Sequence, residues 1–177
     1  SDDRFHAFLG KPGSELYDLG TLGGQTSHAY DVNENTHVCG WTQISFTLPD
    51  SRGFFWANGV MKSVGTAGGI YSAAFALNDY DEVVGATTRE DGTTVAFLWK
   101  NDHLYDLNLM IPAGSDWVLE RAWDIDEAGA IVGEGMLAGV PRAFLLTPAQ
   151  ASGVPEGGPG TGTRFAGAFP NPARGPA

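Results

Sequence analysis

Short apolar runs separated by turn residues dominate this chain. Residues 27–32 alternate between the two faces of an extended chain, as a half-buried strand does. Together with its neighbours this run forms a unit of four predicted strands, at residues 7–9, 16–19, 27–32 and 38–42. Helical periodicity is hardly visible, so the pattern predicts an all-β fold.

The four-strand pattern returns about 45 residues later, which marks an internal repeat. The matched positions are Gly23 and Gly68, Asn33 and Asn78, and Gly40 and Gly85. The third unit is more diverged, but Asp126 precedes Gly133 by the same seven residues. We predict units at about residues 4–51, 52–95 and 96–142, followed by a closing strand at 143–148 within a domain of residues 1–150.

Turn residues recur at fixed places in the units. Asn58-Gly59 lies where the first hairpin reverses, and this dipeptide readily supplies the positive φ of a tight turn. The glycine pairs between the second and third strands are structural turns rather than a phosphate loop, because no lysine and no helix start follows them. Gly85 and Gly133 indicate close backbone approach within a sheet.

Units of this size match β-propeller blades, in which four-stranded sheets pack face to face around an axis. Three blades do not close a ring, so we predict a partial or open propeller, with self-association as one way to complete it. The same strand count also fits a β-trefoil, which is the alternative fold.

Composition and charge narrow the function classes. The chain has 177 residues, 42% of them hydrophobic, and a net charge of −11 without a basic cluster, which disfavours nucleic acid as a partner. The only cysteine, Cys39, lies in an apolar strand and is predicted to be a small core residue. No apolar stretch is long enough to span a bilayer.

Several motifs resemble the HAF repeats of secreted bacterial proteins. The resemblance is carried by His6-Ala7-Phe8, by residues 18–29, by residues 96–99 and by the asparagine that precedes Val83-Val84-Gly85, and it extends over residues 4–148. Residues 106–119 and 142–148 resemble the last repeat of such proteins. The resemblance implies a location outside the cytoplasm and no catalytic residues.

The composition changes after Pro148. Residues 151–164 are rich in glycine and proline and are predicted to be a flexible linker. Residues 165–177 resemble the truncated start of a C-terminal sorting domain used in type IX secretion, which also implies the bacterial surface or the extracellular space.

Candidate chemistry is sparse. The four histidines are scattered, so a zinc site is disfavoured, and Ser27 and Ser72 are expected to bond the backbone rather than to act as nucleophiles. No cofactor is expected. Oxygen ligands for calcium could come from Asp79, Asp81, Asp124 and Asp126, although the EF-hand spacing is missing.

These observations favour a non-enzymatic extracellular or cell-surface module that binds a glycan, a protein or an envelope component. The alternative is a fragment of a propeller enzyme that acts on carbohydrate. The aromatic side chains selected as candidates for sugar stacking are Trp41, Tyr71, Tyr80, Trp117 and Trp123.

Overall fold

The computed structural model describes residues 5–46 and 50–149 and the main chain of residues 165–170. Within these residues the protein is all-β, with fourteen strands and a single-turn 3-10 helix, η1 (Leu107–Leu109), and no sheet closes on itself. The all-β prediction is confirmed. The strands are β1 (Ala7–Leu9), β2 (Tyr17–Gly20), β3 (Ser27–Val32), β4 (Val38–Gln43), β5 (Ser51–Ala57), β6 (Val60–Gly65), β7 (Gly68–Leu77), β8 (Val83–Arg89), β9 (Thr94–Lys100), β10 (His103–Asp106), β11 (Trp117–Ile125), β12 (Ile131–Leu137), β13 (Val140–Pro148) and β14 (Phe165–Pro170).

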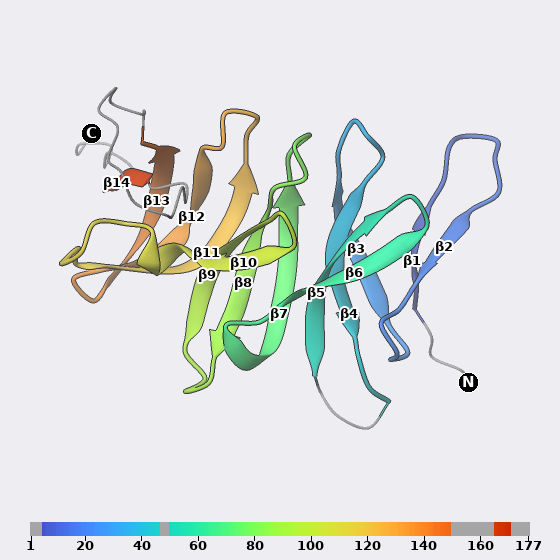
Figure 1. Ribbon diagram of the computed structural model, residues 1–177, viewed down its shortest axis with the longest axis horizontal. Helices are drawn as coiled ribbons and strands as arrows, with labels where there is room; N and C mark the ends of the chain where they lie inside the picture. Colours follow the sequence, from blue (N-terminus) through green and yellow to red (C-terminus); the bar gives the residue numbers. More distant parts are fainter. Residues whose placement is uncertain (1–4, 47–49, 150–164, 171–177) are drawn as a thin grey trace, which may run out of the picture.

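Consecutive strands pair antiparallel in three groups of four, here called the first meander (β3–β6), the second meander (β7–β10) and the third meander (β11–β14). Strands β1 and β2 form a separate two-stranded sheet. The groups stand side by side along the long axis, from β1 and β2 at one end to the third meander at the other (Figure 1). One parallel pair, Ser51 with Tyr71, joins the first two meanders.

The meanders are offset from the sequence units by two strands. Each predicted unit opens on a Phe-rich strand, whereas β5, β9 and β13 are the third strands of their meanders. Strand β14 fills the fourth position of the third meander, although it comes from the segment predicted to begin a sorting domain. That assignment stays a prediction, and residues 151–164 and 171–177 lie outside the described residues.

Three apolar cores lie between the successive sheets. Phe54 faces β1 and β2, whereas its neighbour Phe55 faces the second meander, as alternation along a strand requires. Cys39 is fully buried in the core between the first two meanders, which confirms it as a core residue. Among the described residues, the first two meanders are therefore covered on both faces, and the uncovered faces lie at the two ends of the array.

The recurring glycines sit where the chain comes closest to itself. A Cβ atom on Gly85 would lie 2.0 Å from the carbonyl oxygen of Ala73, and one on Gly133 would lie 2.1 Å from that of Arg121. Asn58 and Gly59 adopt φ of 51° and 85° at the β5–β6 turn. The predicted close approach and the predicted turn are both confirmed.

Buried polar links join each sheet to the next. Ser72 Oγ donates to the carbonyl of Gly65 (2.6 Å) and accepts from the amide of Gly53 (2.9 Å), and Ser27 makes the matching bonds at the preceding junction. The expectation that these serines bond the backbone is confirmed. At the third junction the Asn108 side chain exchanges two hydrogen bonds with the main chain of Leu119 instead.

A ladder of side-chain amides joins the turns between the first and second strands. Asn33 Nδ2 donates to the carbonyl of Asn78 (3.0 Å), and Asn78 Nδ2 donates to the carbonyl of Asp126 (3.1 Å). Each of the three side chains also accepts an amide of its own turn. In the described part of the chain, no helix is long and apolar enough to cross a membrane.

Candidate functional site

One aromatic residue in the first strand of each meander is displaced from regular pairing. The register shifts between Ala29 and Asp31 in β3, between Ala74 and Ala76 in β7, and between Ala122 and Asp124 in β11. Each shift leaves one extra residue, as in a β-bulge. The three extra residues, here called the aromatic row, are Tyr30, Phe75 and Trp123.

The aromatic row is continuous across the three meanders. The ring centroids of Tyr30 and Phe75 lie 5.9 Å apart with tilted planes, and those of Phe75 and Trp123 lie 4.7 Å apart and are stacked. Tyr30 and Trp123 are 54% and 46% exposed, respectively, so both ends of the row meet solvent.

Further rings lie against the Tyr30 end of the row. Trp41 Nε1 donates to the Tyr30 hydroxyl (2.9 Å), and the His28 ring stacks on Trp41 at 4.7 Å. Burial raises the pKa of Tyr71, Tyr30 raises it further, and Arg121 acts in the opposite direction. Because Tyr30 and Arg121 both act on its hydroxyl, Tyr71 lies near the aromatic row.

Charged groups border the Trp123 end of the row. Arg121 Nη1 donates to Glu134 Oε1 (3.0 Å), and both side chains are more than 40% exposed. Asp124 Oδ1 accepts the amide of Ile125 (2.9 Å). Aromatic rings beside exposed donors and acceptors can contact the C–H face of a sugar ring and its hydroxyl groups together.

The five aromatic residues selected from the sequence fall into three settings. Trp41, Tyr71 and Trp123 lie at or beside the aromatic row. Trp117 is buried in the core, edge-on to Phe144. Tyr80 is exposed in the β7–β8 turn, beside a separate hollow of about 280 Å³.

Sequence reasoning missed Tyr30 and Phe75. Their signal is an aromatic residue that directly follows alanine in the first strand of each meander, as in Ala29-Tyr30, Ala74-Phe75 and Ala122-Trp123. This signal was hidden because the three aromatic types differ and because the displacement depends on pairing with the second strand.

The four aspartates considered as calcium ligands are engaged within the protein. Each accepts at least one hydrogen bond, and Asp126 Oδ1 accepts two, from the amides of Ala128 and Ala130. Among the residues that the structure describes, no three His, Cys, Asp or Glu side chains gather in a metal-binding arrangement. Calcium binding by Asp79, Asp81, Asp124 and Asp126 stays a prediction.

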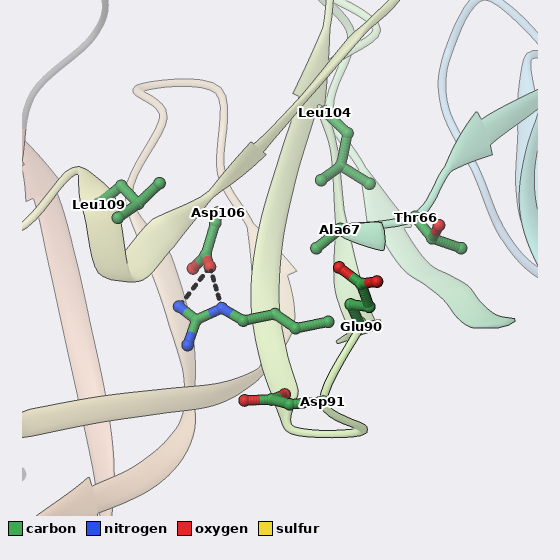
Figure 2. A pocket seen from close by; sticks show the side chains of 8 residues that line it. Thr66, Ala67, Glu90, Asp91, Leu104, Asp106 and Leu109 are labelled. Atoms are coloured by element: carbon green, nitrogen blue, oxygen red, sulfur yellow. Dashed lines mark hydrogen bonds and ion pairs between the residues drawn. The ribbon is translucent and has the colours of Figure 1, made fainter. Parts of the chain in front are cut away.

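A second hollow, of about 520 Å³, lies among the connections β6–β7, β8–β9 and β10–η1 (Figure 2). Arg89 Nε donates to Asp106 Oδ2 (2.9 Å), which neutralises the one cation in the lining. Hydrogen bonds from Thr93 lower the pKa of Asp91. The charges left in this hollow are the carboxylates of Glu90 and Asp91, so it disfavours anions and carries no aromatic surface for a sugar.

Comparisons with models of protein families, with curated proteins and with solved structures find no match to this chain. The site is therefore interpreted from its own geometry.

Proposed function

We propose that this protein is a non-enzymatic, extracellular or cell-surface binding module and that the aromatic row with its neighbours binds a glycan. The observation that carries the proposal is the row itself, in which the first strands of the three meanders present rings in contact with one another and exposed at both ends of the row. A sugar could stack on the open end of the row at Trp123, while Arg121 and Glu134 reach its hydroxyl groups.

The proposed architecture is an open, propeller-like array in which each meander is a blade. Three features support it over a β-trefoil: the meanders stand side by side, their first strands share a displaced residue, and none of the described sheets closes into a barrel. In such an array the first strands line the inner wall, which is where propellers often hold their ligands. The location outside the cytoplasm rests on the resemblance to HAF repeats and to sorting domains.

The alternative, a propeller enzyme acting on carbohydrate, needs free carboxylates at the row. Glu134 is held by Arg121, and Asp124 caps the amide of Ile125, so both already have partners. We therefore propose binding without hydrolysis at this surface.

Affinity electrophoresis in gels containing β-glucan, xylan, mannan or pectin tests the proposal. At least one polymer should retard the protein, and Trp123→Ala should weaken this retardation about tenfold, the loss expected for one stacking contact of roughly 1.4 kcal/mol. Tyr80→Ala is the matched control, because this ring is exposed at the far turn and its loss should change nothing.

Three outcomes contradict the proposal. Absence of retardation by every polymer argues for a protein or envelope partner. A loss of retardation in Tyr80→Ala but not in Trp123→Ala would move the site to the β7–β8 turn. Release of reducing sugar in the same gels would favour the enzyme alternative.

A further inference from the structure

The outer face of the third meander exposes large apolar side chains. Val118, Val132 and Leu145 alternate with residues of the core between the second and third meanders, so they point to the opposite side of the sheet. They are 40–43% exposed. Val118, Val132 and Leu145 are here called the C-terminal face.

Matching positions in the second meander are buried. Val84 and Leu98 stand in the second and third strands where Val132 and Leu145 stand in the third meander, and both pack against the meander that follows. The C-terminal face therefore has the chemistry of an internal sheet-to-sheet interface, without a following sheet among the described residues.

The other end of the array presents the complementary half of this interface. Phe8 in β1 is 61% exposed, and Ala7 and Leu9 on either side of it pack against the first meander. In the other meanders, the phenylalanine in the position of Phe8 is buried against the preceding sheet. These residues are Phe54, Phe97 and Phe144.

We propose that a second copy of this chain docks head to tail, with the C-terminal face of one copy against the Phe8 face of the other. The occupant is inferred from continuity with the internal interfaces, because each of these places a Phe8-type side chain against the preceding C-terminal-type face. Two copies that make this heterologous contact at both of their ends form a closed ring. If the ring does not close, further copies add to the free ends and give longer assemblies.

This contact leaves the ring of Trp123 open, whereas Arg121 and Glu134 lie on the same outer face as Val132. Strands β1 and β2 correspond to the third and fourth strands of a meander, so they cover β13, which carries Leu145. Trp123 and Val118 lie on the first strand, β11, for which the docked sheet has no counterpart, so the contact centres on Leu145 and its neighbour Val132. Association should therefore leave stacking on Trp123 intact, and either property can fail without the other.

Light scattering on the full chain, from about 1 µM to about 500 µM, tests the association. The protein should reach a mass of two or more copies, and either Phe8→Glu or Leu145→Glu should reduce it to one copy. Near-UV circular dichroism should show that both variants keep their tertiary structure. Leu109→Glu is the matched control, since Leu109 is exposed and lies on η1, away from both faces.

Mixing the two variants gives the sharpest result. Phe8→Glu keeps an intact C-terminal face and Leu145→Glu keeps an intact Phe8 face, so the mixture should form a dimer with one native contact. A face-to-face dimer of C-terminal faces would instead survive Phe8→Glu, which would overturn the head-to-tail proposal. A monomeric mass at every concentration would overturn it as well.

Discussion

Replacing Ser72 by alanine tests what holds neighbouring meanders together. The Ser72 hydroxyl is fully buried, donates to the Gly65 carbonyl and accepts from the Gly53 amide. Alanine removes both bonds and leaves a buried N–H group without a partner, which costs about 1–3 kcal/mol, beyond roughly 1 kcal/mol for the lost donor bond. We expect Ser72→Ala to lower the free energy of unfolding by about 2–4 kcal/mol.

Urea unfolding followed by tryptophan fluorescence and far-UV circular dichroism measures this loss. For a chain of this length the change corresponds to a fall in Tm of about 4–16 °C. A lower m-value in Ser72→Ala would show that the meanders have begun to unfold separately. Ser63→Ala is the control, because the Ser63 hydroxyl accepts one exposed hydrogen bond, from the amide of Gly65, and its loss should cost less than about 0.5 kcal/mol.

The reasoning fails if Ser72→Ala and Ser63→Ala are equally stable. Apolar packing alone would then join the sheets, and the recurrence of serine at positions 27 and 72 would need another cause. Ser27→Ala provides an independent check, because its hydroxyl makes the same pair of bonds between β1–β2 and the first meander.

Two further predictions concern titration and access. Burial raises the pKa of the Cys39 thiol, so a thiol reagent at neutral pH should leave the folded protein unmodified. In urea, the reagent should label Cys39 only as the core between the first two meanders opens. Rapid labelling of the folded protein would contradict the burial of Cys39. Hydrogen bonds with the His6 side chain and from the Gly20 amide lower the pKa of Asp18. The contribution of Asp18 to the stability of the fold is therefore present above the ordinary aspartate pKa and is lost as the pH falls through the lowered pKa. Asp18→Asn should flatten the acid side of a plot of Tm against pH, and an unchanged acid side would contradict the assigned interaction.

Tight turns and close backbone approaches could be predicted from the sequence. Asn58-Gly59 and Gly85 could be assigned from sequence because a positive φ and a missing Cβ each depend on the residue itself. The grouping of strands could not be assigned in the same way, because a third strand such as β5 is paired on both sides and the sequence does not show where one sheet ends.

The candidate site was predictable only in part, for a related reason. Trp117 and Trp123 both lie on β11, yet one is buried and the other is exposed. The register shift between Leu119 and Arg121 separates them, because an extra residue between the two positions interrupts the alternation that sequence reasoning relies on. Trp41 and Tyr71 were selected as single aromatic residues, but only the side-by-side packing of the meanders shows that they share a surface with Trp123.

The hydrogen-bond ladder and the apolar faces end differently, and this difference affects how a second copy can dock. Asn33 and Asn78 each donate a side-chain amide to the next turn, but Asp126 stands in the third turn, and its side chain has no amide N–H group to donate. The ladder therefore stops at the third meander, whereas the apolar pattern continues onto its outer face at Val132 and Leu145. Docking of a second copy must then depend on apolar contact, so association should persist at high salt and should be lost on Leu145→Glu. An association that disappears with salt would point instead to ion pairing between the two ends of the array.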